Sequence, residues 1–347
     1  MTSRLALLAS LLALAGGLAA CGSDDDGEAA AGAPEGGQET LTVYSGRAER
    51  LVGDLYKQFE RESGVKVEVR YGDSAELAAT LAEEGDNSPA DVFFSQDAGA
   101  LGAVEQAGLL EKLPQATLDS VDADYRDASG TWVGVSGRAR VVAYSTERVE
   151  ASELPGSIFD FTDPKWKGRI GFPPPNASFQ AFISGMRLAV GDERTKQWLE
   201  DIKKNEPALL ENNIQTEEAI AAGEIDVGFV NHYYVFELRA ERPDFPVANH
   251  FLEDGDPGTL VNVSGAGILK SADPKGPAQQ LVDYLLSEKG QEYFSAETSE
   301  YPLVDGVAPP KGARPLEEVE GPDIELDALG GQLQSTLELL NEVGLTT

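Results

Sequence analysis

Cysteine, histidine and basic residues are all scarce in this 347-residue chain, which has one Cys and two His. An internal disulfide bond is impossible with one cysteine, and a Cys/His zinc site or an iron–sulfur cluster is excluded or nearly so. Lys and Arg number 27 against 60 Asp and Glu, giving a formal net charge of −33. A surface of that sign repels phosphate backbones, so we do not expect nucleic acids as partners.

Sequence signatures of common enzymes are also missing. No dinucleotide-binding G-x-G-x-x-G follows an expected strand, and the chain has neither a phosphate-binding G-x-x-x-x-G-K-[ST] loop nor a G-x-S-x-G nucleophile elbow. A Ser-His-Asp triad would have to use His232 or His250, and neither has a flanking signature. We therefore do not expect an enzyme, and an extracellular hydrolase is the alternative from another functional class.

The start of the chain has the pattern of an export signal. Arg4 precedes the apolar run Leu5–Leu14, which is too short to span a bilayer, and small residues follow it. The sequence Leu-Ala-Ala before Cys21 resembles the lipobox of bacterial lipoproteins. We predict a signal peptide over residues 1–20 and a lipid-modified Cys21 that anchors the protein outside the cytoplasmic membrane. Residues 21–40 are acidic and have too few large apolar side chains to form a core, so they would be a disordered tether.

The remaining chain alternates between short apolar strands and helical patterns, first from residue 41 to about 108 and again over 164–245. Such alternation is typical of βαβ units on a parallel sheet. Two β-rich runs, 131–145 and 259–269, can carry the chain from one α/β lobe to the other and back. Two crossings make a two-stranded hinge, around which two lobes close on a ligand.

The expected domain division follows from these crossings. The first lobe would contain residues 41–137 plus 264–314, and the second lobe residues 138–263 plus 315–347. A leucine stripe over 325–343 predicts an amphipathic helix that packs on the second lobe.

Adjacent tyrosines, Tyr233 and Tyr234, follow an expected strand and begin an expected helix. In open α/β sheets ligands bind outside the carboxyl ends of strands. At a loop-to-helix junction both phenols can converge on one point, and a bound multivalent cation favours their ionised form. Two phenolates suit a hard trivalent metal such as Fe(III). Without further context, the same dipeptide is more typical of half-buried packing.

From Leu41 to about Lys311 the sequence resembles the periplasmic ferric-ion-binding proteins, which are substrate-binding components of iron ABC transporters. The resemblance rests on six blocks: residues 41–46 (LTVYSG), 88–93 (SPADVF), 136–140 (SGRAR), 164–171 (PKWKGRIG), 223–226 (GEID) and 231–234 (NHYY). It implies an α/β, two-lobed periplasmic-binding-protein fold of the class II type.

The resemblance also implies roles for individual residues. Tyr233 and Tyr234 match the family's Fe(III) ligands. The family holds a synergistic anion, phosphate or carbonate, on its second lobe, and the matching positions are Asn176, Ala177, Ser178, Asn213 and Asn231. Free backbone N–H groups at a helix start suit an anion. An arginine of the family contacts this anion near the hinge. Arg138 and Arg140 are the candidates, and strand alternation places both on the same face.

The chain departs from the family where the first lobe supplies metal ligands. Many members have a His after the first strand and a Glu after the third, and the matching positions here are Ala48 and Gln96. Alanine cannot bind a metal, and glutamine offers an oxygen without charge. The neighbouring Glu49 or Asp97 would be the substitutes. The sequence therefore predicts two protein ligands for the metal, Tyr233 and Tyr234. An anion, water, a carboxylate or a chelator would fill the other coordination positions.

The sequence as a whole predicts the extracytoplasmic substrate-binding component of an ABC importer. It would act as a lipid-anchored monomer that captures Fe(III), with a synergistic anion, and delivers it to a membrane permease and its ATPase. The alternative within the same receptor class is an organic or anionic solute, such as a phosphonate, a thiamine-like cation or a polyamine.

Overall fold

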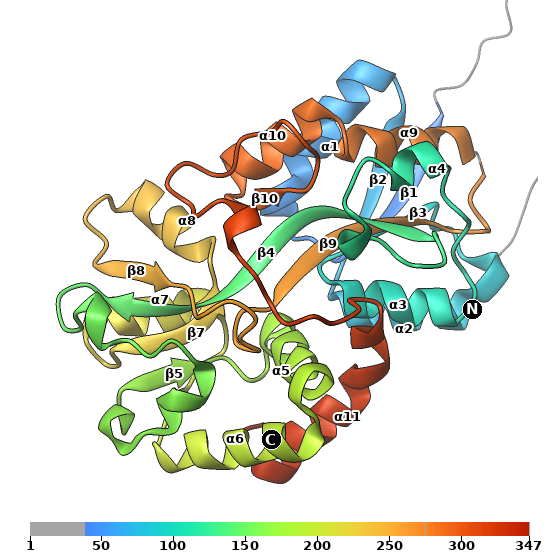
Figure 1. Cartoon of the computed structure of the whole chain (residues 1–347). Helices are drawn as coiled ribbons and strands as arrows, with labels where there is room; N and C mark the ends of the chain where they lie inside the picture. Colours follow the sequence, from blue (N-terminus) through green and yellow to red (C-terminus); the bar gives the residue numbers. More distant parts are fainter. Residues whose placement is uncertain (1–38, 274, 347) are drawn as a thin grey trace, which may run out of the picture. The chain divides into compact units, whose positions relative to one another are not determined.

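The computed structural model describes residues 39–273 and 275–346 (Figure 1). The predicted signal peptide, Cys21 and the tether as far as residue 38 lie outside the described residues. The described elements all belong to one unit, Gln38–Thr347. None of the helices in this part of the chain is long and apolar enough to cross a membrane.

One path of hydrogen-bonded strands runs through this unit in the order β2-β1-β3-β9-β4-β7-β5-β6. Within it β2, β1 and β3 are parallel to one another, as are β7, β5 and β6, whereas β4 and β9 run antiparallel to their neighbours. The path consists of β1 (Thr40–Ser45), β2 (Lys66–Tyr71), β3 (Val92–Ser95), β4 (Trp132–Ser145), β5 (Ile170–Phe172), β6 (Ala208–Leu209), β7 (Val227–Asn231) and β9 (Val261–Ile268). Two further strands, β8 (Val247–His250) and β10 (Tyr301–Pro302), also pair with β4.

Strand β4 joins the two halves of this path. Its residues up to Ala139 pair with β9, and from Arg140 onward they pair with β7 and β8. The return crossing is tied to the first, because the Arg140 N–H donates to the carbonyl oxygen of Leu260 at 2.9 Å. A long strand that leaves one sheet and enters another was expected from residues 131–145. The β-rich run predicted there forms one continuous strand, β4.

Helices cover both halves of the sheet path (Figure 1). The helix of residues 49–63 shows why they form: Val52, Leu55, Tyr56 and Phe59 recur at helical spacing and are buried, and Gly64 ends the helix with a φ of 77°. The helices are α1 (Glu49–Ser63), α2 (Ser74–Glu84), α3 (Ala98–Gln106), α4 (Gln115–Leu118), α5 (Ala177–Val190), α6 (Asp192–Lys204), α7 (Asn213–Ala222), α8 (Tyr234–Glu241), α9 (Lys275–Leu285), α10 (Glu288–Glu297) and α11 (Ala328–Val343).

Separate apolar cores form on the two sides of the hinge. The larger core gathers β1, β3 and β9 with the helices that pack on them. On the other side an aromatic core contains Phe172, Phe179, Trp198 and Phe229, with the rings of Phe172 and Phe179 stacked 5.0 Å apart. A smaller core lies between β7, α7 and α8. The two-lobed α/β class expected from the sequence is confirmed.

Helix α11 contributes to both main cores. Leu329 packs into the larger core, as does Leu326 just before the helix, whereas Leu339, Leu340 and Val343 pack into the aromatic core. Figure 1 shows the helix, in dark red, running beside α3, α5 and α6. The sequence placed this helix on the second lobe alone, because a leucine stripe does not tell which core buries each part of it.

The C-terminal half of α11 is expected to contribute strongly to stability. Leu340 is completely buried, so Leu340→Ala should lower the free energy of unfolding by about 2–5 kcal/mol, mostly through lost burial and the remaining cavity. Glu338→Ala on the exposed face of the same helix should change it by less than about 0.5 kcal/mol. Denaturant unfolding of both variants measures the difference. Equal effects would show that α11 is not anchored through Leu340.

Candidate functional site

The paired tyrosines lie where β7 ends and α8 begins. Two hydrogen bonds hold the turn between β7 and α8 against β4. The His232 N–H donates to the Ala139 carbonyl oxygen at 3.0 Å, and the Ala139 N–H donates to His232 Nδ1 at 3.2 Å. The rings of Tyr233 and Tyr234 lie side by side, with centroids 4.2 Å apart. Tyr233 is buried and Tyr234 is partly exposed. A loop-to-helix junction therefore brings the two phenols together, as the sequence predicted.

The surroundings of the phenols set their protonation. Burial raises the pKa of the Tyr234 phenol well above its usual range, and the charge of Tyr233 and a hydrogen bond with it raise it further. Arg138 and Arg50 oppose this shift, but only in part. The Tyr234 phenol is therefore protonated near neutral pH unless a cation displaces the proton.

Polar side chains from four elements, β4, α5 with its N-cap, α7 and β7, meet beside this turn. Asn176 caps α5 by accepting from the Ser178 N–H at 3.1 Å, and the Asn213 side-chain amide donates to the same oxygen at 3.2 Å. Arg140 donates to the side-chain oxygen of Asn231 at 3.1 Å and more weakly to Asn213 and Ser178, both at 3.4 Å. The structure thus brings together four of the five predicted anion-site positions and Arg140. The fifth position, Ala177, is the first residue of α5.

Two buried guanidinium groups next to this network form no ion pair in the described part of the chain, although the Asp97 carboxylate lies close enough to Arg138 to act on it. Arg140 donates only to neutral oxygens, including the Phe229 carbonyl at 2.6 Å, and burial lowers its pKa to about 9. Arg138 donates to the carbonyl oxygen of Gln96, while its Nε and Nη1 atoms have no hydrogen-bond partner in the described part of the chain. Arg140 therefore remains charged at neutral pH, and this charge has no ion-pair partner among the described residues. The two arginines lie close enough to repel each other.

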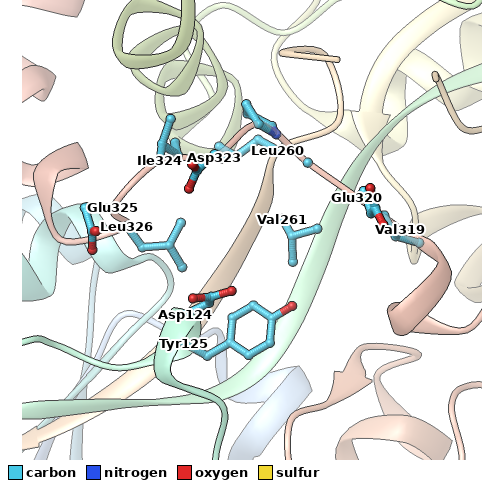
Figure 2. A pocket seen from close by; sticks show the side chains of 12 residues that line it. Asp124, Tyr125, Leu260, Val261, Val319, Glu320, Asp323, Ile324, Glu325 and Leu326 are labelled. Atoms are coloured by element: carbon cyan, nitrogen blue, oxygen red, sulfur yellow. The ribbon is translucent and has the colours of Figure 1, made fainter. Parts of the chain in front are cut away.

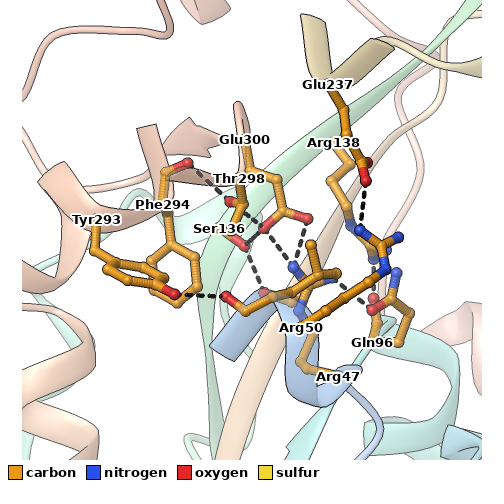
Figure 3. Close-up of polar contacts among 12 residues, drawn as sticks. Arg47, Arg50, Gln96, Ser136, Arg138, Glu237, Tyr293, Phe294, Thr298 and Glu300 are labelled. Carbon is orange, nitrogen blue, oxygen red and sulfur yellow. Dashed lines mark hydrogen bonds and ion pairs between the residues drawn. The ribbon is translucent and has the colours of Figure 1, made fainter. Parts of the chain in front are cut away.

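A third buried arginine, Arg47, follows β1 and faces the phenols from the first lobe, across the region between the two lobes, which we call the cleft. Its Nη2 atom donates to both carboxylate oxygens of Glu300 at 2.7 and 2.8 Å, and its Nη1 atom donates to Gln96 Oε1 (Figure 3). The Ser136 hydroxyl donates to the same carboxylate at 2.7 Å. Burial alone would lower the pKa of Arg47, but Glu300 and the two phenols raise it overall. Arg47 is therefore a fixed cation facing the tyrosine pair.

Sequence reasoning missed Arg47 and Glu300. The two residues lie 253 positions apart in the chain, so no local pattern could have paired them. The one available signal was an arginine directly before Ala48, where the family's first-lobe ligand is expected.

The expected first-lobe substitutes lie elsewhere or are already engaged. Gln96 accepts from Arg47, and an Asp97 oxygen caps α3 by accepting from the Ala100 N–H at 3.0 Å. Glu49 is exposed at the start of α1, and its charge acts on Tyr71 and Lys57. Across the cleft, Arg50 of α1 instead pairs with Glu237 of α8 at 2.6 Å (Figure 3).

The two histidines have structural contacts. His232 is buried and stacks on Tyr301 with centroids 4.3 Å apart, and burial lowers its pKa to about 4. His250 Nε2 contacts the carbonyl oxygen of Pro155 at 2.8 Å. Among the described residues, no serine or threonine hydroxyl is hydrogen-bonded to either ring. The geometry therefore gives no support to a hydrolase triad.

Two cavities border the cleft region. One of about 260 Å³ is lined by residues from both sides, including Asp97, Ala177, Gln180 and Leu333. Another cavity, of about 340 Å³, lies between the start of β9, at Leu260 and Val261, and the segment 319–326 (Figure 2). The first cavity is lined by Asp97 and Ala177, whereas the second contains none of the predicted site residues.

Comparison with known proteins agrees with this geometry. A family of bacterial extracellular solute-binding proteins matches residues 87–320. The chain belongs to this family. The Fe(3+)-binding periplasmic protein of Serratia marcescens is 32% identical over 343 residues, covering 98% of this chain and 96% of that protein. The major ferric iron-binding protein of Neisseria meningitidis is 32% identical and covers 88% of this chain and 93% of the relative.

Solved structures of family members have the same fold. Iron-bound HitA from Pseudomonas aeruginosa superposes with a TM-score of 0.83 at 34% identity, covering 88% of this chain and 99% of that chain. The Trichodesmium protein IdiA (FutA), solved with iron and citrate ligands, has a TM-score of 0.77 at 31% identity. The match covers 88% of this chain and 100% of that chain. The family and fold expected from the sequence are confirmed, and this is a family of solute-binding proteins.

The ion pair between Arg47 and Glu300 should dominate the stability of the first-lobe side. Glu300→Ala leaves the Arg47 charge buried without its carboxylate, which should cost about 3–5 kcal/mol of unfolding free energy. Glu237→Ala removes the exposed partner of Arg50 and should cost less than about 1 kcal/mol. Denaturant unfolding of the iron-free variants compares the two. A small effect of Glu300→Ala would mean that Arg47 finds another partner.

Proposed function

We propose that this protein is the extracytoplasmic substrate-binding component of an ABC importer that captures Fe(III) together with an anion. The supporting observation is the tyrosine pair at the end of β7, which lies beside the buried Arg140, an arginine without an ion-pair partner in the described part of the chain. Tyr233 and Tyr234 would bind the metal as phenolates, since Fe(III) displaces their protons. Relatives named for ferric iron binding support this choice of cargo.

The charge balance of the cleft requires an anion. Arg47 is paired with Glu300 and Arg50 with Glu237. The Asp97 carboxylate acts on Arg138, but Arg140 has no ion-pair partner among the described residues. Fe(III) with two phenolates adds further positive charge. A phosphate, a carbonate or a polycarboxylate chelator would neutralise this excess and complete the metal coordination, with Arg140, Asn176, Ser178, Asn213 and Asn231 around it and Ala177 contributing its backbone.

The first lobe would then act through charge and hydrogen bonds. Arg47, fixed by Glu300 and Gln96, faces the phenols and any anion beside them. Glu49 would have to swing inward from the exposed start of α1 to reach the metal. We therefore place the metal bonds on the second lobe, and we assign closure to electrostatic attraction between the first lobe and the bound anion.

The remaining parts of the proposal concern the cell. Members of this family work with an ABC permease and an ATPase, and we propose the same partners here. We further propose that the protein is a monomer without catalytic activity, held outside the cytoplasmic membrane by a lipid on Cys21. The lobe boundaries proposed are residues 41–137 plus 264–314 and residues 138–263 plus 315–347.

The metal ligands can be tested by visible absorption. Titrating the protein that begins after Cys21 with ferric citrate should produce a phenolate-to-iron charge-transfer band. The band should saturate near one equivalent of iron. Tyr233→Phe and Tyr234→Phe should each weaken the band, because each removes one phenolate. Tyr125→Phe, a tyrosine of the cavity shown in Figure 2, is the matched control and should leave it unchanged.

Two results would count against this assignment. A band that persists in both tyrosine variants would place the ligands elsewhere. No band in the wild type, with phosphate and carbonate each supplied, would favour an organic or anionic solute as the cargo.

The anion site can be tested without iron. Phosphate should raise the melting temperature of the iron-free protein, because a ligand that binds only the folded state stabilises it by mass action. Arg140→Met should abolish this rise by removing the buried charge. Arg126→Met on the surface, where Arg126 pairs with Asp119, should preserve it. An undiminished rise in Arg140→Met would contradict the proposed anion site.

A further inference from the structure

A pocket of about 450 Å³ lies beside the tyrosine turn, between α8, β8, β10 and residues 312–314. It contains none of the site residues predicted from the sequence. Its wall is mainly aromatic and basic, with these side chains: Phe236, Arg239, Asn249, Phe251, Tyr301 and Arg314. A pocket of this size, apolar with a few polar groups, is typical of small-molecule sites.

Two polar atoms of this wall, the Tyr301 hydroxyl and the Asn249 side-chain oxygen, lack hydrogen-bond partners in the described part of the chain. Tyr301 is completely buried, yet its hydroxyl has no hydrogen-bond partner among residues 39–273 and 275–346. The side-chain oxygen of Asn249 is also unsatisfied there, while its amide nitrogen donates to the His232 carbonyl oxygen at 2.7 Å. Unsatisfied buried polar groups cost free energy, which a bound ligand with matching groups would recover.

The charge of the wall favours an anion. Arg314 lies over the ring of Phe251, 5.5 Å from its centroid, and is close enough to Tyr301 to act on its hydroxyl. Its nearest acids, Asp254 at 3.9 Å and Glu318 at 3.8 Å, are exposed and pair with it at long distance. None of the described lining residues is acidic.

The same wall contacts the turn that carries the paired tyrosines. Tyr301 stacks on His232, and Phe236 meets the His232 ring edge-on with centroids 6.4 Å apart. Asn249 holds the His232 backbone by the hydrogen bond described above. His232 directly precedes Tyr233, so an occupant of the pocket would contact side chains that hold the tyrosine turn in place.

We propose that this pocket binds a small aromatic carboxylate that carries a hydroxyl group. Arg314 and the Tyr301 hydroxyl bind the carboxylate, the rings of Phe236 and Phe251 enclose the aromatic ring, and the ligand hydroxyl donates to the Asn249 side-chain oxygen. The occupant restrains the His232–Tyr234 turn and slows the loss of the ferric cargo. The binding site stands independently of the iron proposal, whereas the effect on cargo retention rests on it.

Calorimetric titration of the iron-free protein with 4-hydroxybenzoate tests the binding site. This probe should bind at one site, and Arg314→Ala should lower its affinity about tenfold or more by removing a charge-assisted hydrogen bond. Tyr301→Phe should lower it severalfold without unfolding the protein, because the lost hydroxyl has no partner. Arg194→Ala is the matched control, since Arg194 also lies over a phenylalanine ring, that of Phe159. It should leave the affinity unchanged.

The cationic analogue tyramine should not bind. Absence of 4-hydroxybenzoate binding up to about 10 mM would overturn the proposal. So would binding that Arg314→Ala leaves intact but Arg140→Met abolishes, because the acid would then occupy the cleft.

Iron transfer to an external chelator tests whether an occupied pocket slows the loss of the ferric cargo. The transfer should be slower with 4-hydroxybenzoate present, and Arg314→Ala should remove the difference. An unchanged rate, in a protein shown to bind the acid and to hold iron, would overturn the coupling alone.

Discussion

The burial of guanidinium groups is the constraint on which the cleft depends. A buried charge is costly unless it is paired, and breaking such a pair costs more than the pair itself contributes. Arg47 is paired with Glu300, whereas Arg138 and Arg140 have only neutral hydrogen-bond partners. The protein thus keeps an electrostatic imbalance in its binding site. In the function proposed above, a bound metal–anion complex would neutralise this positive charge, and the charge match would contribute affinity and selectivity.

The hinge strand explains how these charges come to the same place. Strand β4 carries Arg138 and Arg140 two residues apart, so both side chains lie on one face. Its register sets Arg140 opposite Asn231, at the end of the strand that leads to the tyrosine pair. The same strand pairs with β10, which holds Tyr301 against His232. Strand β4 therefore connects the polar network of Arg140 and Asn231, the tyrosine turn, and the pocket lined by Tyr301.

Local patterns predicted the parts of the site that depend on short stretches of chain. The tyrosine pair at a strand-to-helix junction, the Asn176 cap and the shared face of Arg138 and Arg140 were all evident from the sequence. The partner of Arg47 was not, because Glu300 reaches it only through folding. The division of α11 between two cores was missed for the same reason: periodicity gives the buried face of a helix but not its neighbours.

A crystal structure of the ferric complex, with iron located by its anomalous scattering, tests the central claim most directly. The account predicts iron bonded to the phenolate oxygens of Tyr233 and Tyr234. Anion, chelator or water oxygens would complete the coordination, and Arg140 would contact the anion. Iron bonded to Glu49 or Asp97, or bound away from both tyrosines, would contradict it.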